Sequence, residues 1–210
     1  MRRAMEAERA ASWAFRARGL VGALLGVAFG TLVVFSPPLF SQAQWERIPL
    51  EVLGWLTFFA GAAMRFWATL YIGGRKRQVI VSEGPYSICR NPLYLGTFLI
   101  ALSTAIILES MTFLACVLVG AVFYAWATVP AEERYLSRRF GGPYHRYCRE
   151  VPRFLPRLAN FGTPDTIVVN IRALRLECCR AARWVLLPVV ADLLCRLRCE
   201  TWWPHWVNLP

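Results

Sequence analysis

The sequence is poor in charged residues, and acidic residues are the scarcer kind. Of the 210 residues, 18% are charged, with 13 acids against 24 bases, and 57% are hydrophobic. Soluble domains contain about 25% charged residues, and disordered chains combine low hydrophobicity with high charge density. A disordered chain is therefore excluded. A single soluble core of this size is also too small to bury so much apolar surface.

Paired cysteine motifs are absent from the sequence. The seven cysteines are scattered along the chain, and no two of them have the C-x-x-C spacing. This arrangement matches neither a zinc site nor a disulfide framework. We therefore expect reduced thiols and no bound metal.

Aromatic residues and positive charge are abundant. Trp, Tyr and Phe make up 14% of the chain, and the formal net charge is +11. Aromatic rings are enriched where a protein crosses the membrane–water interface. The basic residues lie between apolar blocks, a pattern that favours anionic lipid head groups over nucleic acid. We expect membrane lipids as partners and no nucleic acid.

Four apolar blocks can be distinguished, at residues 19–45, 48–72, 91–108 and 110–131. The first has no charged residue and is long enough to cross a hydrocarbon layer of about 30 Å. The second contains Glu51 and Arg65, and an arginine at this depth is either functional or snorkels to the surface. Only Glu109 and its neighbours separate the last two blocks, which predicts a tight helical hairpin with Glu51 and Glu109 in solvent.

Basic residues alternate between the two sides of these blocks. They are frequent before the first block, after the second and after the fourth, whereas the loop after the first block has only Arg47 and the hairpin tip has none. The positive-inside rule then predicts an all-α, multi-pass integral membrane protein with four transmembrane helices and with N and C termini cytoplasmic.

The chain beyond residue 162 has a different character. On a helical projection four arginines fall within one arc, and apolar residues gather opposite, which predicts an amphipathic interfacial helix in the head-group plane. The arginines are Arg172, Arg175, Arg180 and Arg183, and the apolar residues are Ile171, Leu174, Cys178, Ala181 and Val185. Pro188 and Asp192 argue against a fifth span. We divide the chain into a membrane domain, residues 1–162, and a membrane-associated tail, residues 163–210.

Two expected cytoplasmic loops contain more turn signals than ordinary loops do. In residues 78–96 a short apolar run, 78–81, precedes the turn Gly84-Pro85. Asn91 suits a helix N-cap and Pro92 suits the first helical position, so the third span is expected to begin there. The backbone N–H groups of a helix start favour a bound carboxylate.

The second such loop covers residues 130–156. Glu132 and Glu133 follow Pro130, and a short helix is expected to run to Phe140, where Gly141-Gly142-Pro143 stops it. Adjacent acids on a helix point about 100° apart, so they cannot form a facing acid–base pair. One of the two can face a ligand while the other faces water.

Together these stretches resemble the isoprenylcysteine carboxyl methyltransferase and phospholipid methyltransferase superfamily of integral membrane enzymes. The resemblance covers residues 70–157, the expected catalytic core. It rests on Gly84-Pro85-Tyr86, Arg90-Asn91-Pro92-Leu93-Tyr94, Glu132-Glu133, Phe140-Gly141, Tyr144, Tyr147, Val151-Pro152 and Pro156.

The resemblance implies methyl transfer from S-adenosyl-L-methionine, bound at the cytoplasmic face, to a lipophilic or lipidated acceptor. That acceptor would be an isoprenylcysteine-like carboxylate, a phospholipid amine or a thiol. The family's cofactor contacts correspond here to Gln78, Val79, Ile80, Val81, Tyr86, Asn91, Pro92, Leu93, Tyr94 and Glu132. A sulfonium is already a good leaving group, so the protein's work is positioning and water exclusion, and no metal is needed.

The sequence departs from the family pattern at two positions. Asn91 replaces the usual His, and an amide cannot carry a proton. Thr128 stands where isoprenylcysteine enzymes have an Arg that meets the substrate. The candidates to replace that arginine are Arg65, Arg134 and Arg153, and no catalytic acid or base is assigned.

Two other functions stay open. Membrane sterol and steroid reductases, which use NAD(P)H, share a similar R-H-x-x-Y region. They commonly have an acid soon after Y-x-G, where this chain has Thr97. A non-enzymatic membrane scaffold with a basic tail would explain residues 163–210 but not the spaced motifs.

Overall fold

The computed structural model describes residues 30–39, 44–74 and 79–206. All regular elements in these ranges are helical. They are α2 Gln44–Ile72, α3 Pro85–Ile88, α4 Pro92–Leu108, α5 Met111–Phe123, the π-helix η1 Tyr124–Thr128, α6 Val129–Phe140, α7 Gly142–Glu150, the 3₁₀-helix η2 Leu158–Asn160, α8 Ile171–Trp184 and α9 Leu186–Arg198. Most of the first expected span lies outside the described residues, and residues 30–34 of it are helical.

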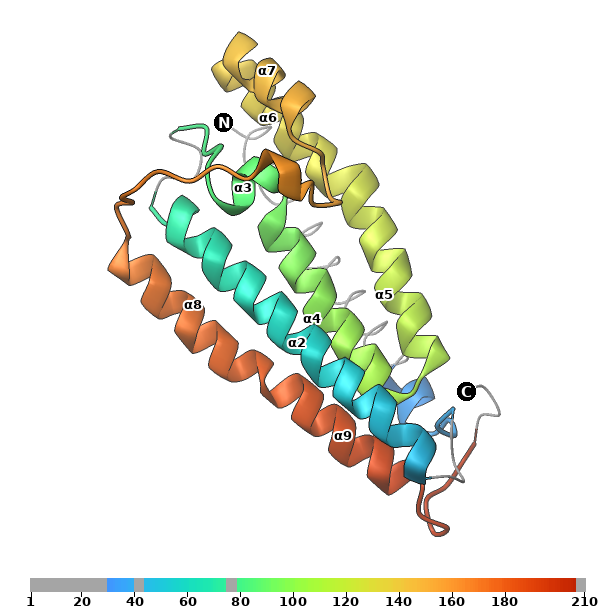
Figure 1. The fold of residues 1–210 in the computed structure, drawn as a ribbon. Coiled ribbons are helices and arrows are strands. Elements are labelled where there is room, and N and C mark those ends of the chain that lie inside the picture. Colours follow the sequence, from blue (N-terminus) through green and yellow to red (C-terminus); the bar gives the residue numbers. More distant parts are fainter. Residues whose placement is uncertain (1–29, 40–43, 75–78, 207–210) are drawn as a thin grey trace, which may run out of the picture.

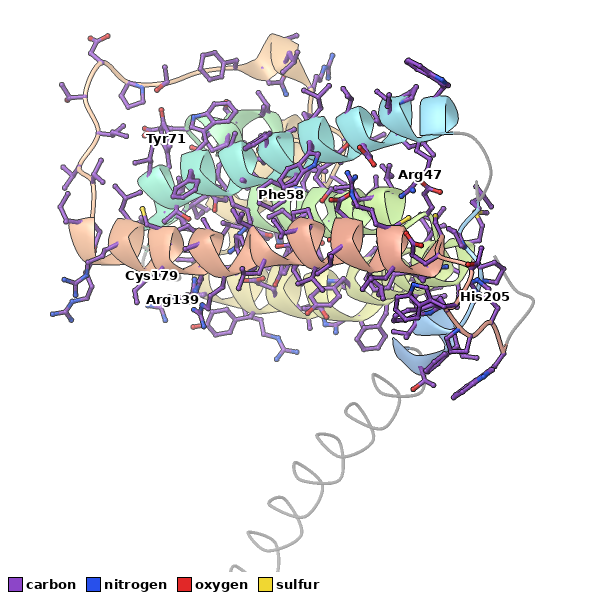
Figure 2. All side chains as sticks on the ribbon, turned by 90° about the horizontal axis from the view of Figure 1, so that it is seen from below. Arg47, Phe58, Tyr71, Arg139, Cys179 and His205 are labelled. Atoms are coloured by element: carbon purple, nitrogen blue, oxygen red, sulfur yellow. The ribbon has the colours of Figure 1, made fainter. Side chains whose placement is uncertain are left out.

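The long helices form a bundle with two distinct ends (Figure 1). Helix α4 packs against α2, α5 and α9, and α2 also contacts α8. At one end, called the loop end, lie α3, α6 and α7. The α4–α5 turn and the last described residues lie at the other, called the hairpin end. In the view of Figure 2, Arg47 and His205 mark the hairpin end, and Tyr71 and Cys179 lie toward the loop end.

The hairpin between α4 and α5 is as tight as expected. Glu109 adopts a left-handed conformation with φ 49°, and Ser110 caps α5 by accepting a hydrogen bond from Phe113 N at 3.2 Å. The expectation that Glu109 is solvated is wrong. Its side chain is buried and pairs with Arg47 at 3.0 Å, because the turn lies against the start of α2.

Two glycines bring α2 and α4 into close contact. A Cβ atom on Gly61 would lie 2.8 Å from the carbonyl oxygen of Gly96, and one on Gly96 would lie 2.7 Å from that of Gly61. Small residues allow this approach between membrane helices. The contact holds Arg65, one turn after Gly61, against the first turns of α4.

The fourth apolar block belongs to a continuous helix, Met111–Phe140, which in the described part of the chain is the one helix of 18 or more residues apolar enough to cross a membrane. Pro130 does not end it, because η1 absorbs the disruption. Proline has no N–H to donate and its ring crowds the carbonyl four residues earlier. The backbone there widens so that Val129 N donates to Tyr124 O. The helix ends at Phe140 before Gly141, φ 59°, as expected.

The tail does not adopt the position expected from its sequence. Helices α8 and α9 run lengthwise beside α2 rather than across an end of the bundle (Figures 1 and 2). Trp206 N donates to Phe35 O at 3.0 Å, and the two rings stack. The described tail therefore finishes at the hairpin end, opposite the loops that were expected on the same side.

Two buried charges explain this placement. Glu177 of α8 pairs with Arg65 at 2.8 Å, and its side chain is 2% exposed. Arg198 of α9 is fully buried and donates to the carbonyl oxygens of Ser36, Pro37 and Leu108, each at 2.8 Å. The inward face of α8 is therefore centred on an acid. Ile171, Cys178 and Val185, which were placed on the apolar face, are exposed.

Candidate active site

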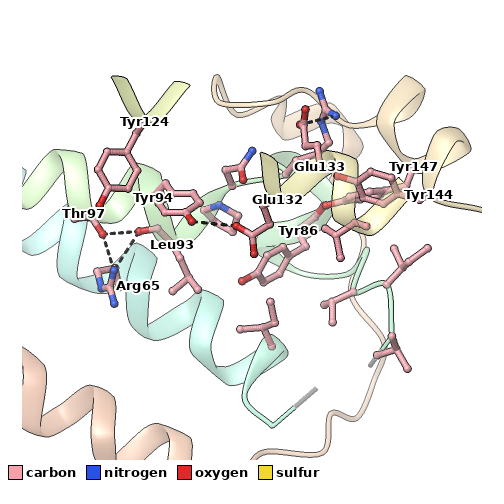
Figure 3. A pocket seen from close by; sticks show the side chains of 18 of the residues that line it. Arg65, Tyr86, Leu93, Tyr94, Thr97, Tyr124, Glu132, Glu133, Tyr144 and Tyr147 are labelled. Atoms are coloured by element: carbon pink, nitrogen blue, oxygen red, sulfur yellow. Dashed lines mark hydrogen bonds and ion pairs between the residues drawn. The ribbon is translucent and has the colours of Figure 1, made fainter. Parts of the chain in front are cut away.

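A cavity of about 400 Å³ lies at the loop end of the bundle (Figure 3). Its walls come from α2, the segment 79–81, α3, the first turns of α4, η1, α6, α7 and α8. The volume falls in the range of small-molecule sites. The two loops with many turn signals therefore meet around one space.

The start of α4 forms one wall of this cavity. The helix begins at Pro92 with Asn91 at the N-cap, as expected, but the Asn91 side chain makes no capping hydrogen bond. Its Nδ2 instead donates to Arg153 O at 3.0 Å. In the same extended segment, Pro152 O accepts a hydrogen bond from Arg90 N at 2.9 Å. The backbone carbonyl groups of residues 152 and 153 thus hold the start of α4 in place.

Glu132 and Glu133 diverge as the helix geometry requires. Glu132 lines the cavity and accepts a hydrogen bond from Tyr94 Oη at 3.0 Å. Glu133 pairs with Arg90 at 2.9 Å and with Arg153. Both acids line the cavity, but Glu133 joins α6 to the start of α4, whereas Glu132 lies beside Tyr94 (Figure 3).

Three buried tyrosines close the cavity on the side of α3 and α7. Tyr147 Oη donates to Tyr86 O at 2.8 Å, which ties α7 to α3. Tyr86 Oη is buried and has no hydrogen-bond partner among the described residues. Burial raises the pKa of Tyr86, Tyr144 and Tyr147 above the ordinary value of 10.0. All three phenols are therefore neutral donors near neutral pH.

These raised pKa values predict a loss of stability at high pH. Unfolded phenols ionise near pH 10, whereas the folded ones stay protonated, so the stabilisation is fully present below pH 10 and declines as pH rises above it. The three phenols should leave the melting temperature unchanged up to about pH 9 and lower it at higher pH. The melting temperature of Tyr147→Phe, which lacks one such phenol, should fall less steeply with pH. The same slope in the variant and in the unsubstituted protein would contradict the assignment.

Arg65 lies in the cavity wall away from α3 and is held by several groups. Its Nη1 donates to Thr97 Oγ1 at 2.6 Å and to Leu93 O at 3.3 Å, and its Nε donates to Glu177. Its guanidinium also lies over the Trp184 ring, 4.1 Å from the centroid. Helix α8 thereby becomes part of the cavity wall.

Comparison with known proteins identifies relatives of this chain. A model of the phospholipid methyltransferase family matches residues 50–142. The chain is 30% identical over 166 residues to the nickel-cobalt-cadmium resistance protein NccN of Alcaligenes xylosoxydans xylosoxydans, covering 79% of this chain and 78% of that protein. It is also 30% identical to the cobalt-zinc-cadmium resistance protein CzcN of Cupriavidus metallidurans, over 76% and 75% of the two chains.

A plant enzyme completes the comparison. Protein-S-isoprenylcysteine O-methyltransferase B of Arabidopsis thaliana is 31% identical over 59% of this chain and 66% of its own. The chain belongs to the phospholipid and isoprenylcysteine methyltransferase superfamily. No solved structure matches it. Membership makes it a membrane methyltransferase by family, and the loop-end cavity is its candidate active site.

The residues that the superfamily resemblance selects converge on this cavity. Of the ten expected cofactor residues, Gln78 lies outside the described residues, and the other nine all line the cavity. Arg65 lines it as well. Arg134 is exposed, Arg153 is engaged by Glu133, and neither is among the lining residues, nor is Thr128. In the described ranges no cluster of three His, Cys, Asp or Glu could hold a metal ion.

Sequence reasoning missed the contribution of α8. Glu177 and Arg180 lie in the tail, which the superfamily motifs do not cover, yet Arg180 lines the cavity and Glu177 supports Arg65. One signal could have revealed them. Glu177 is the single acid in residues 166–191, and it falls on the helix face opposite several of the arginines.

Proposed function

We propose that this chain transfers a methyl group from S-adenosyl-L-methionine to a lipophilic, membrane-borne acceptor. The observation that carries the proposal is the convergence of Tyr86, the first turn of α4 and Glu132 on one cavity. These groups come from three separated parts of the sequence. The match to a methyltransferase family supports the reaction class.

The chemistry of the lining groups fits this cofactor. The helix start at Asn91–Tyr94 favours a carboxylate, and the Glu132 carboxylate can accept hydrogen bonds from an ammonium or from ribose hydroxyls. A buried hydroxyl is normally paired, so the unpartnered Tyr86 Oη supports a ligand acceptor atom nearby. When bound, the cofactor would supply a methyl group on a positively charged sulfur.

The chain's own work is to orient the two reactants and exclude water. Tyr144 and Tyr147 seal the side of α7, and Tyr94 holds the Glu132 side chain. No group is needed to activate the sulfonium, and of the three arginine candidates Arg65 is the one that lines the cavity. Phe98 and Tyr124 supply an apolar wall for the acceptor.

We also propose an orientation in the membrane. The loop end faces the cytoplasm, because the basic residues of the loops gather there. The cavity then receives a polar cofactor from the cytoplasm and a lipophilic acceptor from the bilayer. Since α8 and α9 lie lengthwise beside α2, they form a fifth bundle segment and bring residue 206 to the outer side, in place of the four-span arrangement with a cytoplasmic C terminus.

Ligand-dependent melting of the detergent-solubilised protein tests the cofactor. S-adenosylmethionine and S-adenosylhomocysteine should each raise the melting temperature, by an amount that grows with ligand concentration. NADPH should leave it unchanged, because Thr97 is tied to Arg65 and Leu93 where the reductases have an acid. Stabilisation by NADPH alone would favour the membrane reductase. If none of the three ligands changes the melting temperature, the result would favour the non-enzymatic membrane scaffold.

Methyl transfer itself can be measured with S-adenosylmethionine labelled in the methyl group. The expected result is label in the organic phase with an S-prenylcysteine, phosphatidylethanolamine or an alkyl thiol as acceptor, and none with boiled protein. Cofactor binding without transfer to these or to a membrane lipid extract would contradict the proposed reaction.

A further inference from the structure

The side of the cavity that carries the apolar wall also holds an arginine of α8, outside the superfamily motifs. This side is formed by Phe98, which lies one turn after Tyr94 in α4, by Tyr124 of the π-helix η1 and by Arg180 of α8. Tyr124 packs against Phe98 with ring centroids 6.0 Å apart and is itself 42% exposed. The cavity is therefore bounded here by an aromatic wall that reaches the surface of the bundle.

Of the two arginines on this side, Arg180 has fewer of its N–H donors engaged. Arg65 is engaged by Glu177, Thr97 and the Leu93 carbonyl and lies over Trp184. Arg180 makes one contact, from Nη1 to Glu177 at 3.3 Å, and its side chain is 52% exposed. Its remaining N–H groups have no partner among the residues that the structure describes. A guanidinium offers five N–H donors in a planar fork that matches carboxylate and phosphate oxygens.

The charges around Glu177 leave an excess on the same side. Arg65 and Arg180 share this single carboxylate, both of whose oxygens are taken. The local sum of these three groups is therefore one positive charge. An anionic group entering beside Arg180 would be attracted, since charges interact strongly where water is partly excluded.

The surface outside this part of the cavity carries both basic and apolar side chains. On α8, Arg172, Arg175 and Arg183 are exposed. On α9, which follows directly, the exposed side chains include Leu186, Val190 and Leu193. Ile171 and Leu176 are exposed on α8 as well, and Arg196 is exposed on α9. Arg180 thus lies on a surface where bases stand beside apolar side chains, as an amphiphile's head group and chain require.

We propose that Arg180 binds the anionic head group, a carboxylate or a phosphate, of the amphiphile that the cavity accepts. The chain of the amphiphile lies along Phe98 and Tyr124, and Glu177 holds Arg65 in the wall so that Arg180 carries the recognition. This rests on the proposed function, because it names the chemical class of the acceptor of the same site. Helix α8 then acts as a specificity element outside the superfamily motifs.

Binding of three matched fluorescent amphiphiles to the full, detergent-solubilised chain tests this without requiring methyl transfer. Each has a twelve-carbon chain with the fluorophore at its far end, and the heads are a carboxylate, a phosphate and the methyl ester of the carboxylate. At least one anionic form should bind tenfold or more tightly than the ester. R180Q should reduce that preference to within about twofold, and R180K should keep part of it.

Arg196 provides the matched control. It lies on the same tail, is 59% exposed and pairs with Asp192 one turn away at 3.0 Å, but it does not line the cavity. R196Q should keep the full preference. Tighter binding of the phosphate form indicates a phospholipid, and tighter binding of the carboxylate indicates an acidic acceptor; both support the site.

Two results would overturn the assignment. One is equal binding of anionic and ester forms by the unsubstituted protein. The other is an undiminished preference in R180Q. Stabilisation by S-adenosylmethionine is measured on every variant in parallel, so a failure of the proposed cofactor site is recognised separately from a failure at Arg180.

Discussion

Glu132→Gln should lower the affinity for S-adenosylmethionine about a hundredfold. The substitution keeps the size of the side chain and its contact with Tyr94 but removes the negative charge that faces the cavity. Losing one partner of a charged, partly buried hydrogen bond costs about 2–5 kcal/mol, and about 2.7 kcal/mol corresponds to a hundredfold. Isothermal titration of the detergent-solubilised protein measures this directly.

Glu133→Gln is the matched variant at the next position. Glu133 is paired with Arg90 and Arg153, so its loss should lower the melting temperature more than it lowers cofactor affinity, which should change by a few-fold at most. The same affinity in Glu132→Gln as in the unsubstituted protein would remove Glu132 from the cofactor site. The reverse ranking of the two variants would assign the cofactor contact to Glu133.

Glu177→Leu should destabilise the folded protein by about 3–5 kcal/mol. The substitution leaves Arg65, which is 13% exposed in the α2–α4–α8 contact, without its counter-ion, and an uncompensated, largely buried charge has a cost of this size. In a chain of this length about 1 kcal/mol shifts the melting temperature by roughly 2–4 °C. A thermal melt in detergent should therefore show a decrease on the order of 10 °C.

A double substitution separates the charge from the packing. Arg65→Leu combined with Glu177→Leu removes both charges, and buried ion pairs are often replaced by apolar groups without loss of stability. The double variant should regain most of the melting temperature lost in Glu177→Leu. Additive losses in the two single variants would show that the pair does not act as a unit.

The helix limits at the loop end could be predicted because their signals are local. Asn91 followed by Pro92 marks the start of α4, and Gly141, with φ 59°, marks the end of α6. Proline at the first helical position and glycine after the last turn act through the backbone of neighbouring residues. A single sequence contains these signals in full. The π-helix before Pro130 was not predictable in the same way, because a proline can end, bend or widen a helix.

The place of the tail could not be predicted because it depends on distant partners. Glu177 pairs with a residue 112 positions earlier, and Arg198 donates to carbonyl groups 90 to 162 positions earlier. A helical projection assigns charged residues to the solvent face. Here the buried acid and the buried arginine are the residues that dock the two helices on the bundle.

The candidate site was predictable in part. Helix geometry alone showed that Glu132 and Glu133 diverge, but the choice of Glu132 came from the resemblance to the superfamily. The structure shows the physical basis of that choice, since Arg90 and Arg153 hold Glu133 and leave Glu132 beside Tyr94. Arg180 belongs to no superfamily motif, so its place in the cavity wall is seen only in the folded structure.

A density map of the protein with S-adenosylhomocysteine bound is the most direct test of the cofactor site. We expect the nucleoside product at the loop end, in contact with Tyr86, the first turn of α4 and Glu132. Density for the product at the hairpin end, or at the loop end without contact to either Glu132 or the start of α4, would contradict the proposed site.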